Sequence, residues 1–258
     1  MNETEELNEF VRNGYKYYMS ELTLDCVIFG YHDKQLKVLL AKYAGLDDWG
    51  LPGGFIKKEE PLTQAATRIL KERTSLDNIF LQQFHTFGDG EDRIKGWHTK
   101  LFPPEFDQLF GEDNWLKQRT ITIGYYALID FEEAAITTDI LYKEFDWHSV
   151  TDLPKLLFSH NELVEKALAT MRNQLYLQPI GYNLLPEKFT LPEIQILYET
   201  ILGKELHRRN FPTKLMSLGI LTKLEEKRKI GQHRSPFLYK FDKEKYEEAL
   251  KNGVVLAF

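Results

Sequence analysis

The 258-residue sequence contains a single cysteine, Cys26, which excludes a disulfide bond within the chain. Cys26 lies in the apolar run LDCVIFG, where a cysteine is typical of a buried strand and not of a nucleophile. No apolar run approaches the roughly 18 residues that a membrane span needs. The N-terminal stretch MNETEELNEFVRNGYKYY is too polar for a secretory signal peptide. We therefore expect a cytoplasmic protein that does not enter membranes.

Acidic residues outnumber basic ones, 39 to 33, but the two signs are unevenly distributed. Residues 186–258 hold 14 Lys and Arg against 10 Asp and Glu, a net charge of +4. Residues 1–185 hold 19 against 29, a net charge of −10. This asymmetry predicts a basic module joined to an acidic one. The overall charge disfavours nonspecific polyanion binding by the whole chain, but it leaves room for a local basic surface that contacts nucleic acid.

The N-terminal half shows strands that alternate with helices. Runs rich in apolar, β-branched and aromatic residues predict strands at residues 22–29, 36–41, 79–87 and 120–131. Residues 32–35 are expected to form a hairpin turn. Residues 62–74 are good helix formers without internal Gly or Pro, and Pro61 suits a first helical turn. With a closing helix at 161–175, the pattern predicts a mixed-sheet α/β domain.

Residues 49–76 read WGLPGGFIKKEEPLTQAATRILKERTSL and resemble the Nudix box, the metal- and diphosphate-binding motif of the Nudix hydrolases. The positions that match the polar and glycine pattern are Gly54, Glu60, Arg68 and Glu72. Ile69 and Arg73 stand where the family has glutamates, and Ser75 stands where it has glycine. An unrelated amphipathic helix after a Gly-Gly turn is the alternative, which the number of positions matched in register disfavours.

The substitutions in this box affect its expected chemistry. On a helix, positions 69, 72 and 73 share a face, where three carboxylates of a Nudix hydrolase would hold a divalent metal. Magnesium needs an oxygen-rich, negatively charged shell. Here that face offers only Glu72, and Arg73 adds a positive charge. Even with Glu60 in reach, the resemblance therefore implies a retained Nudix-type fold with no metal, no cofactor and no catalytic residues.

We expect a small polar effector to bind between the sheet and the Gly-Gly loop. Candidate wall residues are Asp25, Lys42, Phe55, Asp92 and Arg93. A carboxylate and a cation could hold sugar hydroxyls while Phe55 stacks on the sugar ring. The alternative is structural, because Asp25 could cap a strand while Asp92 and Arg93 pair with each other.

Residues 94–118 form a connection that is too long for a plain loop. Its aromatic residues predict local packing, as a lid or part of a dimer contact; they are Trp97, Phe102, Phe106, Phe110 and Trp115. The alternative is a surface excursion without a role.

Residues 178–186 contain Pro and Gly and are predicted to link two domains, residues 1–177 and 178–258. Thr190 followed by Glu193 matches a capping box, which predicts a helix that ends at Gly203. A second helix is predicted at 206–217, with its apolar side formed by Phe211, Leu215 and Met216. Strands predicted at residues 220–225 and 237–241 flank the basic tip KRKIGQHR. This order is typical of a winged helix-turn-helix.

Basic residues concentrate on the second helix and the hairpin of this region. The candidate DNA-binding residues are Arg208, Arg209, Asn210, Lys214, Lys227, Arg228, Lys229 and Arg234. Arg208 and Arg209 would lie near the start of a recognition helix, where side chains meet base edges, and Asn210 could bind an adenine edge. The hairpin cations suit phosphate contacts. An ordinary solvated basic face is the alternative, but it does not account for a cluster that covers both elements.

The C-terminal motifs PIGYNLLPEKFTL, LYETILGKELHRRNF and LYKF, after a degenerate box, resemble the Nudix-related transcriptional regulators of bacteria. That resemblance implies homodimers whose Nudix-like domains bind an effector and whose winged helices bind palindromic operator DNA. It implies either ADP-ribose or, in a branch with a broken box, a pentose such as L-arabinose, and thus control of sugar or NAD-related metabolism. The lost metal ligands favour a neutral sugar.

Two other functions are open from the sequence. The chain could be a Nudix hydrolase that acts on ADP-ribose or a nucleoside diphosphate sugar with Glu60 and Glu72. It could also be an interaction adaptor that uses the Nudix scaffold alone.

Overall fold

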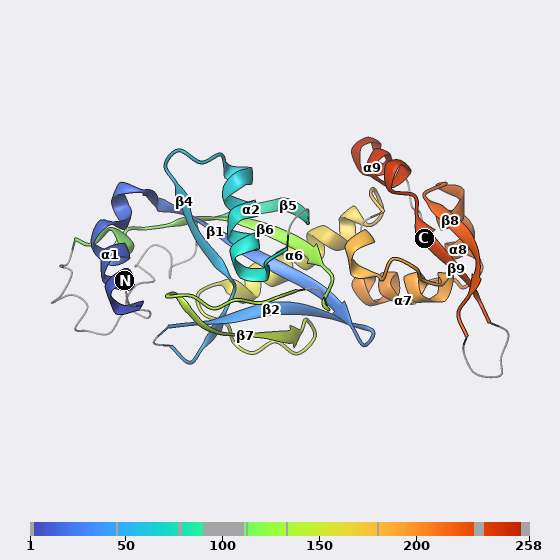
Figure 1. Cartoon of the computed structure of the whole chain (residues 1–258), viewed down its shortest axis with the longest axis horizontal. Coiled ribbons are helices and arrows are strands. Elements are labelled where there is room, and N and C mark those ends of the chain that lie inside the picture. The colour runs from blue at the N-terminus through green and yellow to red at the C-terminus, as the bar shows by residue number, and fades with distance from the viewer. Residues whose placement is uncertain are drawn as a thin grey trace. The chain divides into compact units, whose positions relative to one another are not determined.

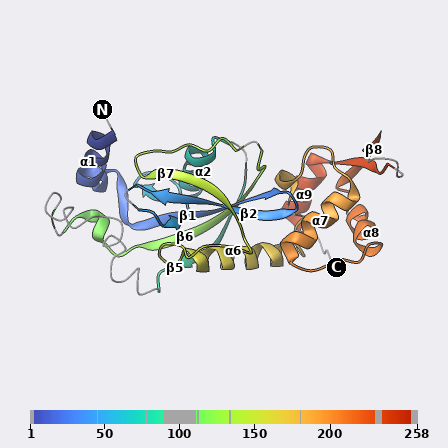
Figure 2. The ribbon, with the colours of Figure 1, turned by 90° about the horizontal axis from the view of Figure 1, so that it is seen from below.

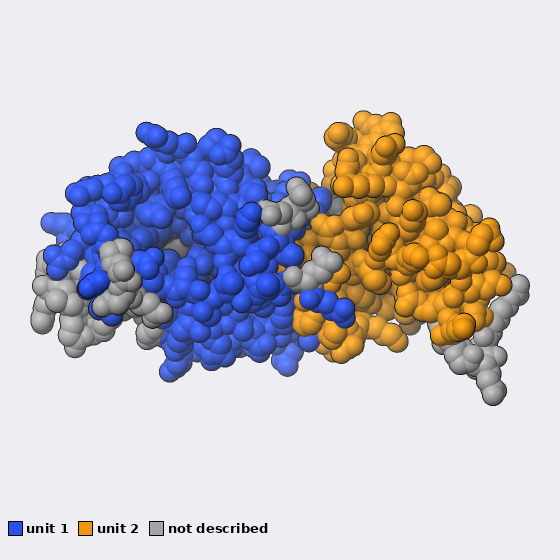
Figure 3. All heavy atoms as spheres, in the orientation of Figure 1, with its two compact units in different colours: residues 1–29, 37–127, 132–167 blue, residues 30–36, 128–131, 168–258 orange. Residues whose placement is uncertain are grey.

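The computed structural model describes residues 3–44, 46–76, 79–89, 111, 113–132, 134–179, 181–229 and 235–253. The chain divides into two compact units, which Figure 3 shows in two colours. Unit 1 comprises residues 1–29, 37–127 and 132–167. Unit 2 comprises residues 30–36, 128–131 and 168–258.

Seven strands of the described residues form one sheet. They are β1 (Tyr18–His32), β2 (Gln35–Tyr43), β3 (Trp49–Gly50), β4 (Gly53–Lys57), β5 (Phe80–Phe87), β6 (Ile121–Ile129) and β7 (Tyr142–Ser149). The strand order is β3-β2-β1-β6-β5, with β4 paired to β1 and β7 paired to β2. These strands confirm the predicted strand positions and give the mixed α/β fold that the sequence indicates.

The long β1–β2 hairpin supplies much of the core. Its turn residues Asp33 and Lys34 have φ of 49° and 59°, the left-handed pair that matches the twist of a two-residue hairpin. The hairpin turn predicted at residues 32–35 is therefore confirmed. Cys26 is fully buried in β1, as expected of a structural cysteine, and burial raises the pKa of its thiol.

Two helices cover the sheet. The helix α2 (Leu62–Thr74) has the bounds that the sequence predicts, and α6 (His160–Gln174) begins one residue before its predicted start. Figures 1 and 2 show α2 over one face of the sheet and the start of α6 over the other. The helix α2 ends at Ser75, which has the left-handed φ of 57° where the family motif has glycine.

An aromatic cluster attaches the N-terminal helix α1 (Glu3–Asn13) to the sheet. Its buried members are Val11, Phe55, Trp115 and Leu116, with Leu7, Phe10 and Tyr18 packed against them. The indole Nε1 of Trp115 donates to the Val11 carbonyl at 2.9 Å. Trp115 confirms local packing at one end of the 94–118 connection. Its other four aromatic residues lie outside the described residues, and the lid or dimer role stays a prediction.

Unit 2 contains a three-helix arrangement with a β-hairpin. The elements are α7 (Leu191–Leu202), α8 (Asn210–Ser217), β8 (Leu221–Lys227), β9 (Phe237–Phe241) and α9 (Lys243–Asn252). The predicted capping box is present, since Thr190 and Glu193 each accept from the other's backbone N–H. Gly203, with φ of 67°, ends α7 as expected. The fold is a winged helix, and we call the β8–β9 hairpin the wing.

Two details of the second helix differ from the prediction. Helix α8 begins at Asn210, not at residue 206. The reason is that side chains of α7 hold the backbone of Leu206: Glu199 accepts from its N–H at 2.9 Å, and Gln195 donates to its carbonyl at 3.1 Å. Met216, predicted to face inward, is 36% exposed. The buried side chains of α8 are those of Phe211 and Leu215.

Some features of this region were not foreseen. The predicted linker includes Leu184 and Leu185, which are buried. The helix α9, whose N-cap Asp242 accepts from the Lys245 N–H, adds Tyr246 and Ala249 to the core. In the part of the chain that the structure describes, no helix is both long and apolar enough to cross a bilayer.

Truncation of the cluster's central ring tests how α1 is held. We expect Trp115→Ala to destabilise the docking of α1 by about 3–5 kcal/mol, because it removes a large buried ring. Hydrogen exchange of the α1 amides should then accelerate strongly. In the control, Trp115→Phe, most ring contacts remain, and Asn114 still donates to the Val11 carbonyl at 3.0 Å, so exchange should change little. Wild-type exchange rates in the alanine variant would contradict this role.

Candidate functional site

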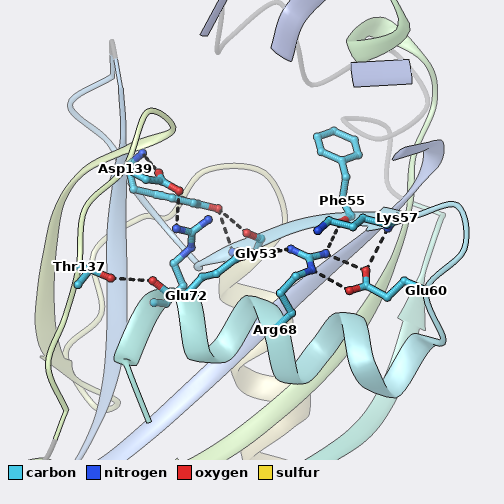
Figure 4. Close-up of polar contacts among 10 residues, drawn as sticks. Gly53, Phe55, Lys57, Glu60, Arg68, Glu72, Thr137 and Asp139 are labelled. Carbon is cyan, nitrogen blue, oxygen red and sulfur yellow. Dashed lines mark hydrogen bonds and ion pairs between the residues drawn. The ribbon is translucent and has the colours of Figure 1, made fainter. Parts of the chain in front are cut away.

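Arg68 is the centre of the Nudix-like box. Its guanidinium donates to Glu60 through Nε (2.7 Å to Oε1) and Nη2 (2.9 Å to Oε2), as Figure 4 shows. Nη1 lies 3.3 Å from both oxygens of Glu72, and Nη2 also donates to the Phe55 carbonyl at 3.1 Å. The structure thus brings Glu60, Arg68 and Glu72 together. The carboxylates of Glu60 and Glu72 therefore both contact the Arg68 guanidinium.

This pairing also fixes the charge state of the box. Hydrogen bonds from Arg68 hold the pKa of the Glu60 carboxyl below its ordinary value, and Glu60 in turn raises the pKa of Arg68. Glu60 also accepts from the Lys57 backbone N–H at 3.1 Å. Gly54 completes the motif, because a Cβ there would lie 3.2 Å from two side-chain carbons of Ile69. Ile69 is buried under the glycine, so it packs and cannot bind a metal.

Arg73 has partners of its own. It is 4% exposed, and its Nη1 lies 2.5 Å from Oδ2 of Asp139. The guanidinium carbon sits 4.5 Å from the centre of the Tyr142 ring. The Tyr142 hydroxyl accepts from the Gly53 N–H at 2.9 Å and donates to its carbonyl at 3.0 Å. Burial raises the pKa of Tyr142 to about 12.

Positions 69, 72 and 73 therefore do not form a common ligand face. Ile69 and Arg73 are buried, while the side chain of Glu72 is 45% exposed and turns to Arg68. Across the described ranges, no group of three or more His, Cys, Asp or Glu side chains could hold a metal ion. The remaining carboxylates of the box are best described as partners of arginine.

Asp25, a predicted effector residue, supports the loop that precedes the box. It is 7% exposed and pairs with Gly53 across β1 and β4. Its Oδ2 lies 3.6 Å from Nε2 of His160, whose Nδ1 accepts from the Leu51 N–H at 2.8 Å. A Cβ on Gly53 would collide with Asp25 and lie 2.6 Å from the Leu24 carbonyl oxygen. No sequence pattern indicates this role of His160, because its partners are far away in the chain.

The other predicted effector residues contact different groups. Lys42 pairs with Glu144 at 2.8 Å and lies 4.5 Å from the centre of a Trp49 ring. Phe55 is only 9% exposed, and its ring centre lies 4.8 Å from that of Trp115. The ring is therefore packed inside the protein, contrary to the expectation that it is open to a sugar. Asp92 and Arg93 lie outside the described residues. The assembly of these residues around one ligand stays a prediction.

The start of α8 carries the exposed polar residues that the sequence singled out. Arg208 and Arg209 lie in the turn before the helix, Asn210 is its first residue, and Lys214 is exposed further along. This corrects the expectation that both arginines lie within the helix. Nδ1 of His207 lies 3.3 Å from the Arg209 nitrogen and 3.4 Å from the Asn210 nitrogen, where it accepts their N–H groups. His207 thus orders the turn, a role that sequence reasoning missed.

The cations of the wing separate into two groups. Nζ of Lys227 lies 4.6 Å from the centre of the Phe237 ring, and Nζ of Lys223 lies 3.7 Å from it. Lys229 is exposed beyond the end of β8. Arg228 instead contacts Glu193 (3.3 Å), and its phosphate contact stays a prediction. Arg234 lies outside the described residues.

Comparisons with known proteins agree with the Nudix-type fold and the winged helix. Residues 19–169 match the model of the NUDIX domain, and residues 181–241 match that of the NrtR DNA-binding winged helix domain. The chain is 29% identical over 234 residues to the ADPR responsive transcriptional repressor NtrR of Acinetobacter baylyi. That match covers 88% of this chain and 84% of the relative.

Solved structures show the same architecture. The crystal structure of Shewanella oneidensis NrtR complexed with a 27mer DNA has a TM-score of 0.69 at 28% identity, covering 88% of this chain and 95% of that one. A MutT/nudix family protein from Enterococcus faecalis has a TM-score of 0.59 at 21% identity, covering 94% and 99%, which supports the fold alone. With its NUDIX domain and NrtR-type winged helix, this chain belongs to the Nudix-related transcriptional regulator family.

Proposed function

We propose that the protein is a DNA-binding transcriptional regulator whose Nudix-type domain senses a small molecule. The observation that carries this proposal is the exposed group Arg208, Arg209 and Asn210 at the start of α8, in a domain that matches the NrtR winged helix. The first residues of a recognition helix are those that contact base edges in the major groove. Two relatives support it, one named a transcriptional repressor and one crystallised with DNA.

The proposed division of labour follows the two domains. Residues 1–177 would bind the effector and form a homodimer, and residues 178–258 would bind operator DNA. Arg208 and Arg209 would select bases, whereas Lys227 and Lys229 would contact phosphates. A dimer is proposed because one winged helix contacts only a half-site, and two-fold symmetry doubles the base contacts. We place this activity in the cytoplasm.

Two effector classes have separate support. ADP-ribose is favoured by the name of the Acinetobacter relative, which is ADPR responsive. A neutral pentose such as L-arabinose is favoured by the box, because Arg68 occupies Glu60 and Glu72 and leaves few acids to hold the metal that would neutralise a diphosphate. The first choice implies control of NAD-related metabolism, and the second implies control of carbohydrate metabolism. Asp25 and Lys42 remain the candidate effector contacts.

We also propose that the Nudix-type domain is not a hydrolase. Arg68 and Arg73 place two cations beside the box, each paired with carboxylates. A divalent metal bound there would have to displace these arginines from their acidic partners. The box then serves as a structural element, and the sensor function needs no chemical step.

The hydrolase alternative is tested directly. We expect no release of ribose 5-phosphate from ADP-ribose in magnesium or manganese, because the metal ligands are absent or paired. The assay is phosphate release after phosphatase treatment, with Glu72→Gln as the control for contaminating enzymes. Steady turnover that Glu72→Gln abolishes would establish the hydrolase and remove this part of the proposal.

The regulator proposal is tested by DNA binding of the full-length protein. We expect a mobility shift on DNA from upstream of its own gene, and a changed affinity when one effector is added. ADP-ribose and L-arabinose are compared, with ribose 5-phosphate and D-glucose as controls. A protein that shifts no upstream fragment, with or without these compounds, contradicts the proposal.

Base selection and phosphate contact can be separated by mutation. Arg208→Ala or Arg209→Ala should cost about 1–3 kcal/mol on the operator and relax its base preference, if the residue forms a bidentate guanine contact. Lys229→Ala should instead weaken all DNA about equally and reduce the salt slope by roughly one. Fluorescence anisotropy at several salt concentrations measures both. If both arginine variants keep the wild-type operator affinity and base preference, the two arginines do not contact bases and the proposed base selection fails.

A further inference from the structure

The wing directs two neighbouring cations to different partners. Its strands pair Lys223 with Tyr239 and Lys227 with Phe237, so the three residues of β8 between these pairs oppose one residue of β9 in an irregular stretch. Lys227 lies over the Phe237 ring. Arg228 continues the ladder, since its N–H donates to the Pro236 carbonyl at 3.0 Å. Successive residues of a strand point to opposite sides, which gives Arg228 a separate environment from Lys227.

Arg228 reaches the segment before α7. Its Nη2 donates to the Lys188 carbonyl at 2.9 Å and lies 3.3 Å from Oε2 of Glu193. Its Nε is buried and has no hydrogen-bond partner within the described structure. The side chains of Arg228 and Glu193 are each 37% exposed. The guanidinium is therefore partly enclosed and already faces a carboxylate.

Glu193 contacts both the N-terminal cap of α7 and Arg228. The same Oε2 accepts from the Thr190 backbone N–H at 2.7 Å and from its hydroxyl at 3.0 Å. This is the capping box that begins α7. One carboxylate oxygen thus joins the cap of α7 to the cation at the end of β8. A change at either group acts on the other through this oxygen.

The segment between these groups is itself paired to the wing. The N–H of Phe189 donates to the Tyr239 carbonyl at 3.0 Å, and the N–H of Tyr239 donates to the Phe189 carbonyl at 2.7 Å. Nζ of Lys188 lies 2.8 and 2.9 Å from the two carboxylate oxygens of Glu226. Residues on both strands of the wing therefore contact the segment that precedes α7 and hold the wing against it.

We propose that Arg228 is a positioning residue which, with Lys188 and Glu193, forms a clamp that holds the wing against the start of α7. It would bring Lys227 and Lys229 to the DNA without contacting phosphate itself. A phosphate at Arg228 would also approach the Glu193 carboxylate, and like charges at that distance repel. This inference rests on the proposed DNA-binding function for its purpose, but the clamp itself is a property of the free protein.

The first test compares Arg228→Gln, Glu193→Gln and the double variant of the full-length protein by anisotropy on operator DNA. Gln at position 193 can still complete the capping box, so this change removes the ion pair and keeps the cap. If the clamp acts as proposed, each single variant weakens DNA binding by about 2- to 5-fold, in the range of one partly exposed ion pair. The double variant should bind no more weakly than Arg228→Gln alone, since the ion pair is already lost in that variant.

A direct phosphate contact gives the opposite pattern. Glu193→Gln would then leave DNA binding unchanged or strengthen it, because it removes a negative charge near the backbone. Arg228→Gln would lower the salt slope by about 0.9, as expected for Lys229→Gln, the matched control. That combination overturns the proposal.

The second test needs no DNA, so it separates the clamp from the proposed function. We measure hydrogen exchange in the free protein for peptides that contain Phe189 and Tyr239, whose amides join the wing to the segment before α7. Faster exchange in both Arg228→Gln and Glu193→Gln, but not in Lys229→Gln, supports the clamp. Wild-type exchange in both clamp variants overturns it, even if the protein binds DNA. If no DNA fragment binds, the regulator proposal fails while this result still decides the clamp.

Discussion

The ion pair between Arg68 and Glu60 is the interaction on which the box depends. It joins α2 to the loop after β4, and the hydrogen bond from Arg68 to the Phe55 carbonyl extends the connection into the sheet. Because the side chain of Glu60 is only 11% exposed, its charge requires this partner. The glycines before the helix then let the loop lie close to β1 and Ile69.

Arg73 is a second arginine of this domain that pairs with a carboxylate. Arg73 and Asp139 are paired under the Tyr142 ring, and Tyr142 holds Gly53 through both backbone groups. In a metal-dependent box, acidic residues gather around an external cation that neutralises them. In this chain, the neutralising cations belong to the protein. Glu60, Glu72 and Asp139 are therefore each paired with an arginine of the same domain.

The winged helix contains both exposed cations and a cation that is paired within the fold. Its exposed cations at the start of α8 are presented by a turn that His207 orders. Arg228 is adjacent to wing lysines in sequence, but its guanidinium is used within the fold. A basic cluster in a sequence thus contains both kinds of residue, and a count of charges does not separate them.

Elements whose causes are local can be predicted from the amino-acid sequence alone. Residues 62–74 form a helix because they combine good helix formers with a proline at the start, and the Thr190–Glu193 capping box lies within four residues. Strand β9 and the β1–β2 turn follow equally from short-range preferences. Helix geometry likewise brings Arg68 near Glu72, because the two residues are four positions apart.

The partner that each polar group takes depends on the tertiary fold. Arg73 and Asp139 are 66 positions apart, and Leu51 and His160 are 109 apart, so no local pattern indicates either contact. The start of α8 was misplaced because Glu199 and Gln195, on another helix, satisfy the Leu206 backbone. Phe55 was expected to face a ligand, but Trp115 from a distant connection covers it. Propensity acts within a few residues, whereas burial and charge pairing depend on what the fold brings near.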